Sequence, residues 1–379
     1  MMTDNLLESR TGIEKFLADF WQKKPLLARG ALAAAANTLD RASMIELACR
    51  DDVESRLVTG ARRVWHVERG PFRKRDFARL PRRGWTLLVN GLETVLPAAR
   101  ALQQQFSFIP YARHDDVMAS YAAPGGSVGP HFDSYDVFLV QGMGARRWQI
   151  SSQRDLRLIA GAPLKILNRF RPQRAWTLHG GDLLYLPPRY AHHGVAVDEC
   201  ITWSVGFRAP DRQEMAEQLL DFVRDHLRVA GAYRDPGLKP QRHPAAIGKD
   251  MLRRIKTMVE AVRWTDADVQ RCLGEYLTEP RPGTVFTRAR RVSAARFAEL
   301  AGARGIRLAL PTRMLTCGAQ IFINNETVAV RATAAKALHE LADTRRLLPG
   351  TRTDAATRAL LYQWYQAGYI DIELSQPTR

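Results

Sequence analysis

The chain has 379 residues, of which 46% are hydrophobic and 25% are charged, and these proportions are ordinary for a globular protein of two or three domains. The first residues are polar, and no apolar run approaches the roughly 20 residues that span a bilayer, so we expect neither a secretory signal nor a membrane segment. The 4 cysteines lie far apart without C-x-x-C spacing, which disfavours a structural zinc site or a disulfide framework and suits a cytoplasmic protein. The formal net charge of +17 leaves a polyanionic partner open.

The first two hundred residues are predicted to pass from helix to strand. Apolar residues in Ile13–Trp21 have helical spacing, and Pro25 ends that pattern. From Trp85 onward the chain has short apolar runs separated by Gly, Pro and Asp, which is typical of an all-β sandwich or barrel. These predicted strands are Trp85–Val89, Val117–Tyr121, Val137–Val140, Arg146–Ile150, Leu183–Leu186 and Ile201–Phe207. The strand region ends near Pro210.

Two amphipathic helices are predicted next, over Asp211–Val229 and Gly248–Val262, with a proline-containing linker between them. Their apolar stripes run from Met215 to Leu227 and from Met251 to Val262. Two helices alone cannot bury such faces, so we expect this segment to form a homodimer. The pattern therefore predicts three domains, covering residues 1–210, 211–279 and 280–379.

The last part of the chain is predicted to be a helical unit with one hairpin. The helices are expected near Ser293–Ala301, Thr333–Arg345 and Asp354–Ala367. A strand pair is expected around Gln320–Val330, with two adjacent asparagines at its turn. This combination is typical of a winged-helix-like module.

The most informative segment is GGSVGPHFD, residues 125–133, together with GDLLYLPPRYAHHG, residues 181–194. In an extended chain, side chains two residues apart point to the same face, so His131 and Asp133 can bind one metal together. A distal histidine, His192 or its neighbour His193, would complete the set. Two imidazoles and one carboxylate on one face of an octahedron leave three open positions, as in non-haem iron(II) oxygenases.

The segment Gly144–Ile150 supplies a candidate anchor for a second ligand. In such oxygenases 2-oxoglutarate binds iron through its keto acid end, and its far carboxylate needs a cation deep in the barrel. A guanidinium fits a carboxylate bidentately and keeps its charge when desolvated. Strand alternation places Arg146 on the same side as Trp148 and Ile150, whereas Arg147 faces the other way. We therefore expect Arg146 to be the anchor.

The chain resembles the bacterial JmjC-type ribosomal oxygenases, which hydroxylate an arginine of a large-subunit ribosomal protein. The resemblance extends over the first 210 residues, and the later helices match the family's layout. The matching stretches are residues 16–27 (FLADFWQKKPLL), 125–142 (GGSVGPHFDSYDVFLVQG), 147–148 (RW), 181–188 (GDLLYLPP) and 203–210 (WSVGFRAP).

The resemblance implies a mainly β catalytic core, a distorted double-stranded β-helix of the JmjC and cupin kind, with helices at its N-terminus. It also implies a helical dimerisation segment and a C-terminal winged-helix domain. Iron(II), 2-oxoglutarate and O₂ are the implied cofactor and cosubstrates. The implied metal ligands are His131, Asp133 and His192, with Arg146 as the 2-oxoglutarate anchor. Ser120 and Thr202 match the same pocket, although Thr202 and His193 stand where Asn and Glu are expected.

A ribosomal-protein arginine entering the pocket needs an anionic partner and an apolar or aromatic wall, for which Asp116, Tyr135 and Met118 are our candidates. Histidine hydroxylation or methyl-lysine demethylation on the same barrel is one alternative. The other is a basic winged-helix nucleic-acid-binding protein with an inactive barrel, because residues 280–379 hold 15 Lys or Arg against 7 Asp or Glu. Contact with rRNA would fit the positive charge in either case.

Overall fold

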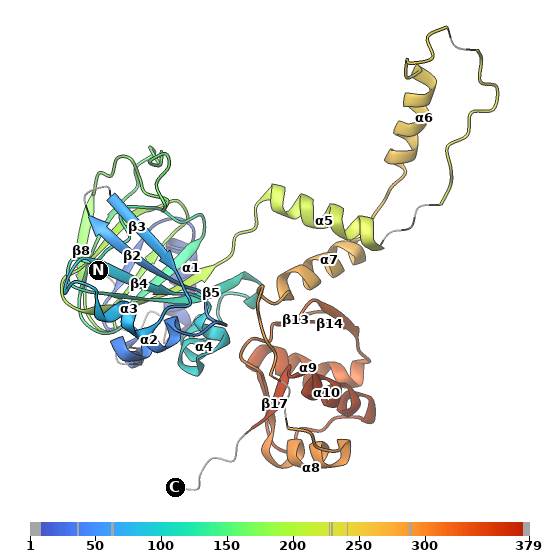
Figure 1. The fold of residues 1–379 in the computed structure, drawn as a ribbon. Helices are drawn as coiled ribbons and strands as arrows, with labels where there is room; N and C mark the ends of the chain where they lie inside the picture. The colour runs from blue at the N-terminus through green and yellow to red at the C-terminus, as the bar shows by residue number, and fades with distance from the viewer. Residues whose placement is uncertain are drawn as a thin grey trace. The chain divides into compact units, whose positions relative to one another are not determined.

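The computed structural model describes residues 9–373, apart from residues 36–37, 62–63, 227, 229, 241 and 288–289. The chain divides into two compact units (Figure 1). The first contains residues 1–209, 280–312 and 343–379, and the second contains residues 210–279 and 313–342. None of the helices among the described residues is long and apolar enough to cross a membrane.

An antiparallel sheet of eight strands forms the centre of the first unit, and Figure 1 shows β2 to β5 side by side. Strands β6 and β9 are buried along their whole length, so both faces of the sheet are covered there. In spatial order the strands are β1 (Leu26–Ala28), β9 (Leu183–Leu186), β6 (Asp136–Gln141), β11 (Cys200–Phe207), β5 (His114–Ala122), β4 (Trp85–Val89), β2 (Ser55–Ala61) and β3 (Val64–Arg69).

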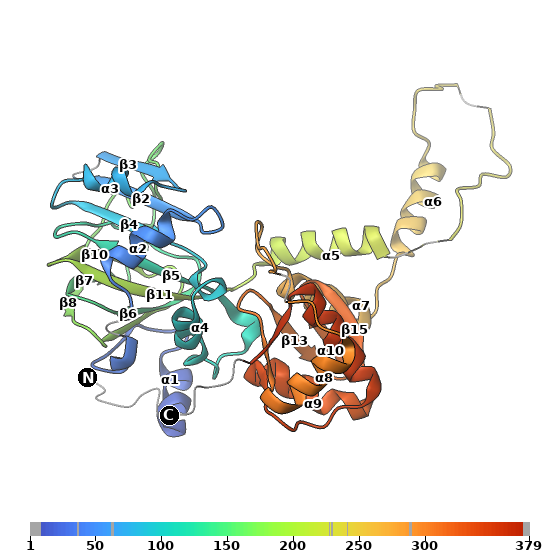
Figure 2. The same ribbon diagram turned by 60° about the horizontal axis from the view of Figure 1, so that its bottom comes forward.

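A second antiparallel sheet has the order β10 (Ala191–Ala196), β7 (Arg146–Ser151) and β8 (Arg174–Leu178) (Figure 2). Trp148 and Ile150 on β7 pack with Val137, Leu139 and Leu184 of the large sheet. The core between the sheets is therefore made by alternate residues of each strand. Each of the six runs predicted as strands between Trp85 and Phe207 is a strand of one of these two sheets.

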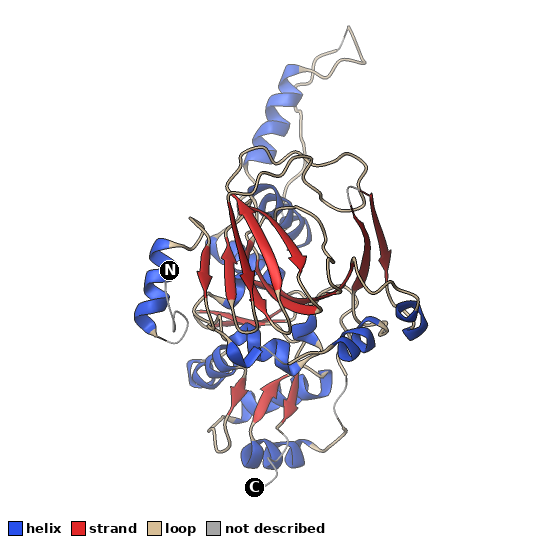
Figure 3. Ribbon diagram, turned by 90° about the vertical axis from the view of Figure 1, so that its left-hand side faces the viewer, coloured by secondary structure: helices blue, strands red, loops and turns tan. Residues whose placement is uncertain are grey.

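Helices and short 3-10 turns cover the large sheet. The helix α1 (Arg10–Asp19) begins at Ser9, whose side chain accepts a hydrogen bond from the Gly12 N–H. Its residue Phe16 is fully buried, with its ring centroid 5.0 Å from that of Tyr185. Figure 3 shows this helix to one side of the strands. The others are α2 (Arg41–Ala48), α3 (Lys74–Ala78), α4 (Pro97–Gln104), η1 (Ala33–Ala35), η2 (Leu92–Thr94) and η3 (Tyr111–Arg113).

The described part of residues 210–279 in the second unit contains three helices, of which two were predicted. These are α5 (Arg212–His226), α6 (Lys249–Glu260) and the additional α7 (Asp266–Thr278). A capping box between Thr265 and Asp268 starts α7 and was the missed signal. Because α7 packs on α5, Phe222 of α5 is buried within the chain, whereas the apolar side chains of α6 are exposed. Leu227, at the end of the predicted stripe, lies outside the described residues.

The C-terminal elements are close to their predicted positions. The hairpin of β14 (Gln320–Ile323) and β15 (Glu326–Ala329) turns at Asn324 and Asn325, which both have positive φ. It pairs with β13 (Met314–Cys317) and contacts α7 in the second unit. The remaining elements are α8 (Ala294–Arg304), β12 (Ile306–Leu308), α9 (Ala332–Thr344), β16 (Arg346–Leu347), α10 (Ala355–Ala367) and β17 (Ile370–Ile372).

Candidate active site

The backbone brings His131 and His192 together although they are 61 residues apart. The His131 N–H donates to the His192 carbonyl at 2.9 Å, and the His192 N–H donates to the His131 carbonyl at 2.8 Å. The approach to this bridge requires Gly129, which has a φ of +82°. A Cβ at that position would lie 2.7 Å from Ile166 and 2.9 Å from the Trp65 ring. The glycine-rich segment therefore lets the chain reach the bridge.

The histidine rings and one carboxylate form a group suited to a metal. One donor atom each from His131, Asp133 and His192 lies within 4.8 Å of the others, and the His192 Nε2 is 3.5 Å from Asp133 Oδ2. The Nδ1 atoms of His131 and His192 each contact a carbonyl oxygen at 2.9 Å. Since a carbonyl only accepts, each Nδ1 carries the proton and each Nε2 keeps its lone pair.

Among the described residues, the group that could hold a metal does not include His193. It follows His192 on β10, so strand alternation turns it to the other face, where the Phe170 ring meets it edge-on at 6.1 Å. Burial, with a smaller contribution from the neighbouring His131, lowers the pKa of His192 to about 4. The buried imidazole is therefore neutral at neutral pH, which is the form that binds metal.

Arg146 lies on β7, the strand that pairs with β10, and the Trp148 ring is 5.8 Å from both its guanidinium and the His192 ring. Its side chain is 6% exposed, whereas Arg147 is at the surface. The Nη1 of Arg146 donates to the Ser120 hydroxyl at 3.0 Å, but its Nε and Nη2 are buried without a hydrogen-bond partner. A buried guanidinium normally has an anionic partner, so these open donors form a site for a carboxylate.

A polar network supports this guanidinium from the large sheet. The Ser120 hydroxyl donates to the Thr202 carbonyl at 3.3 Å, and the Thr202 hydroxyl donates to Gln141 Oε1 at 3.0 Å. The Gln141 amide in turn donates to the Met143 and Ile201 carbonyls. Thr202 is therefore next to the anchor, but its hydroxyl is directed to Gln141. The sequence did not predict Gln141, because it ends an apolar run that reads as a buried strand.

The candidate substrate residues lie on β5 and directly before β6 in the large sheet. Asp116 and Met118 are on the same face of β5 as Ser120, and Asp116 is about 13 Å along the strand from it. Gly206 is the point where Asp116 and Tyr135 meet: a Cβ there would lie 3.2 Å from Asp116 Oδ1 and 3.5 Å from the Tyr135 ring. Burial raises the pKa of Tyr135, and the carboxylates of Asp133 and Asp116 raise it further. The phenol is thus close to both the metal group and Asp116.

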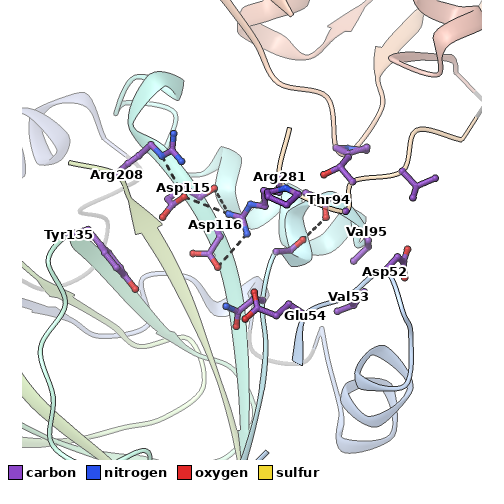
Figure 4. A pocket seen from close by; sticks show the side chains of 17 residues that line it. Asp52, Val53, Glu54, Thr94, Val95, Asp115, Asp116, Tyr135, Arg208 and Arg281 are labelled. Carbon is purple, nitrogen blue, oxygen red and sulfur yellow. Dashed lines mark hydrogen bonds and ion pairs between the residues drawn. The ribbon is translucent and has the colours of Figure 1, made fainter. Parts of the chain in front are cut away.

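A cluster of acids with one arginine surrounds Asp116 (Figure 4). Arg281 enters from the segment that follows α7, and its Nη2 donates to the Asp115 carbonyl at 3.0 Å. The Asp116 and Glu93 carboxylates are 3.8 and 3.6 Å from the same guanidinium. Asp115, Asp116 and Arg281 line a cavity of about 540 Å³, which Tyr135 and Arg208 also line. Sequence reasoning missed Glu93 and Arg281.

Two known protein families match separate parts of the chain. The family described as "JmjC domain" matches residues 101–215, and the family "ROXA-like winged helix" matches residues 261–371. The ribosomal protein uL16 3-hydroxylase of Escherichia coli is 32% identical over 267 residues, which cover 70% of this chain and 71% of that protein. A probable ribosomal oxygenase of Haemophilus influenzae is 40% identical over 218 residues, which cover 54% of this chain and 51% of that protein.

Solved structures give the same result for the fold. The X-ray structure of Escherichia coli YcfD matches with a TM-score of 0.84 and 28% identity, covering 95% of this chain and 98% of that one. The complex of YcfD with cobalt and 2-oxoglutarate matches with a TM-score of 0.81, also at 28% identity, covering 95% and 97%. The predicted fold class and the resemblance are confirmed: this chain belongs to the JmjC-domain ribosomal oxygenases.

Proposed function

We propose that the protein is an iron(II)- and 2-oxoglutarate-dependent oxygenase that hydroxylates an arginine side chain of a large-subunit ribosomal protein, and that uL16 is this protein. The observation that carries the proposal is a three-residue metal group whose His192 lies on a strand that pairs with β7, which carries a buried arginine with unfilled donors. The relative named for uL16 hydroxylation and the cobalt and 2-oxoglutarate complex of YcfD support it. Acting on a ribosomal protein, it would work in the cytoplasm.

The donor set fits iron(II). His131, Asp133 and His192 would hold the metal through two imidazole Nε2 atoms and one carboxylate oxygen. The contacts at Nδ1 orient both rings, and burial keeps His192 unprotonated, so no proton must leave that ring before the metal binds. Bound iron(II) and 2-oxoglutarate together activate O₂ to oxidise an unactivated C–H bond, with conversion of 2-oxoglutarate to succinate and CO₂.

The Arg146 side chain fits the far carboxylate of 2-oxoglutarate. Its open Nε and Nη2 donors can be satisfied by two carboxylate oxygens, while Nη1 stays bonded to Ser120. Ser120 and the Thr202–Gln141 pair hold the guanidinium in place from β5, β11 and β6. The work of these residues is to fix the cosubstrate in one orientation and to exclude water from it.

The mouth of the pocket fits a guanidinium. An arginine side chain entering past Asp116 would meet a carboxylate and the Tyr135 ring, and Met118 would add an apolar wall on the way to the metal group. A carboxylate binds the planar guanidinium fork with two hydrogen bonds, which an ammonium cannot reproduce. This chemistry favours arginine over lysine at the metal.

The test uses the full chain with iron(II), 2-oxoglutarate, O₂ and purified uL16. Tandem mass spectrometry should find one added oxygen atom on an arginine of uL16, and omission of any one of the three should prevent it. Oxidation of a histidine instead would move the protein to the histidyl hydroxylases. Loss of a methyl group from a methyl-lysine would identify a demethylase.

The helical segment is our candidate for a homodimer interface. Apolar side chains of α6, among them Met251, Ile255 and Val259, are exposed in the single chain. A second copy covering them with its own α6 would bury this stripe. Light scattering at micromolar concentration should give the mass of a dimer. Ile255→Asp should give a monomer, whereas Thr257→Asp, on the opposite face of α6, should not; a monomeric wild type would contradict the dimer.

We further propose that the loop between β7 and β8 contacts rRNA close to the substrate protein. The loop carries five exposed basic residues against one acid, Asp155, which is paired with Arg157. The Leu167 N–H donates to the Pro130 carbonyl at 2.8 Å, so the loop lies beside the approach to His131. Binding to rRNA fragments should weaken steeply with salt, and Arg169→Glu should reduce that slope.

We also propose a division of the chain by function, in which residues 1–210 carry catalysis, residues 211–279 dimerisation and residues 280–379 a winged-helix domain.

A further inference from the structure

Arg281 occupies an unusual position for a residue outside the barrel. It lies between Pro280 and Pro282 in the segment after α7, and its side chain is 28% exposed. Its guanidinium enters the acid cluster at the mouth of the pocket, as Figure 4 shows. Gly91 leaves room for it, because a Cβ at Gly91 would lie 3.1 Å from Arg281 Nη1. The surface of the barrel is therefore shaped to receive this side chain.

The charges around Asp116 do not balance within the protein. Three carboxylates, those of Glu93, Asp115 and Asp116, face the guanidiniums of Arg281 and Arg208. Tyr135 lines the same cavity as a neutral phenol. With its three acids ionised this cluster carries a net negative charge, and Glu54 and Asp52 line the same cavity, so an incoming guanidinium meets an excess of carboxylates.

Asp116 uses its two oxygens differently. Its Oδ2 is 3.8 Å from Arg281 Nη1, while its Oδ1 lies beside Gly206 and the Tyr135 ring. Glu93 is held from the other side, since its Oε2 accepts a hydrogen bond from the Val117 N–H at 2.9 Å. One oxygen of Asp116 therefore faces Arg281, and the other faces the part of the pocket that contains Tyr135.

We propose that Arg281 is a positioning residue for substrate recognition: it faces Oδ2 of the Asp116 carboxylate and leaves Oδ1 for the guanidinium of the substrate. This inference rests on the proposed arginine hydroxylation. It makes the segment after α7 part of the substrate site of the barrel. Binding of the substrate arginine then depends on a residue 165 positions away from Asp116 in the chain.

The electrostatics agree with this role. The pKa of Asp116 is raised to about 7: burial raises it most, the charge of Arg281 opposes that rise, and Glu93 and Asp115 add to it. Without Arg281, burial and the two neighbouring acids would raise the pKa of Asp116 further. Only a backbone hydrogen bond from Gly91 would still lower it. Asp116 would then be protonated at neutral pH and could no longer accept two hydrogen bonds from a guanidinium.

The test compares kcat and KM for a uL16-derived arginine peptide in the full-length wild type, Arg281→Gln and Arg281→Lys. Arg281→Gln should raise the peptide KM at pH 7 about fivefold if the pKa of Asp116 rises by one unit and about fiftyfold if it rises by two. It should leave kcat at saturating peptide and the KM for 2-oxoglutarate within about twofold. The loss should shrink at pH 9, where Asp116 ionises again. Arg281→Lys keeps the charge and should keep most of the wild-type pH profile.

Arg307→Gln, which removes an exposed ion pair with Asp371 in the C-terminal part, is the matched control and should behave as the wild type. An unchanged peptide KM in Arg281→Gln would overturn the inference, and so would a loss that is the same at pH 7 and pH 9, since that is the result of a purely structural role. A wild type that converts 2-oxoglutarate but hydroxylates no arginine would instead overturn the proposed function, and the inference with it.

Discussion

The inner end of the pocket and its mouth carry opposite unmatched charges. At the inner end, Arg146 is buried with two donors that no residue in the described part of the chain satisfies. At the mouth, three carboxylates face two guanidiniums. The first arrangement suits a small dicarboxylate and the second suits a cationic side chain. The metal group is made by other residues, so each end can be tested separately by its own ligand.

The largest effect should come from the metal group, on which both ends depend. His131→Ala or Asp133→Ala should reduce 2-oxoglutarate turnover by more than about 100-fold, because loss of an outer partner of a metal ligand alone costs roughly 10–100-fold. Circular dichroism and thermal unfolding should remain close to those of the wild type. His192→Ala should behave in the same way and His193→Ala should not; the reverse result would mean that His193 binds the metal.

At the inner end, Arg146→Met should raise the KM for 2-oxoglutarate by about 10–100-fold, since a hydrogen bond to a charged group contributes about 1.5–3 kcal/mol. Steady-state kinetics at varied 2-oxoglutarate would measure this. Arg147→Met is the matched control, because Arg147 lies on the outer face of the same strand. Equal effects of the two substitutions would show that the inner cation does not hold the cosubstrate.

At the mouth, Asp116→Asn should raise the KM for an arginine peptide by about 10-fold, because a charged hydrogen-bond partner becomes neutral with nearly the same shape. The KM for 2-oxoglutarate should stay the same. Asp52→Asn, at the exposed rim of the same cavity, is the control and should have little effect. A change in the KM for 2-oxoglutarate in Asp116→Asn would mean that the two ends are not independent.

The smallest effect should come from pH. Because the pKa of Asp116 is raised to about 7, its anion is present above that pH and is lost as the pH falls through it. Lowering the pH from 8 to 7 should therefore raise the peptide KM about twofold. Kinetics in a series of buffers would measure this change. A pH dependence of the same size in Asp116→Asn would assign it to another group.

The two ends also differ in how far the sequence predicted them. The inner end is encoded locally: His131 and Asp133 are two residues apart in an extended segment, and strand alternation separates Arg146 from Arg147. The acid cluster at the mouth depends on Arg281, which reaches Asp115 over 166 positions, and no periodicity or spacing reports such a contact.

Other differences from the sequence prediction have equally physical causes. Gln141 was missed because its role appears only when the register pairs it with Thr202 on β11. The helix α7 was missed although Thr265 and Asp268 form a capping box, and its contact with α5 buries Phe222. The apolar stripe on α5 is therefore partly buried within the chain, whereas the apolar side chains of α6 stay exposed.

The most direct test of the central claim compares one peptide series at one site. Peptides from uL16 that differ only in having arginine, lysine or glutamine at the modified position would be incubated with the iron(II)-loaded enzyme, 2-oxoglutarate and O₂. Succinate release and peptide mass would be measured together. We predict an added oxygen atom, with matching succinate, only on the arginine peptide. Equal hydroxylation of the glutamine peptide would contradict the account, because a neutral side chain would then satisfy the acidic mouth as well as a guanidinium does.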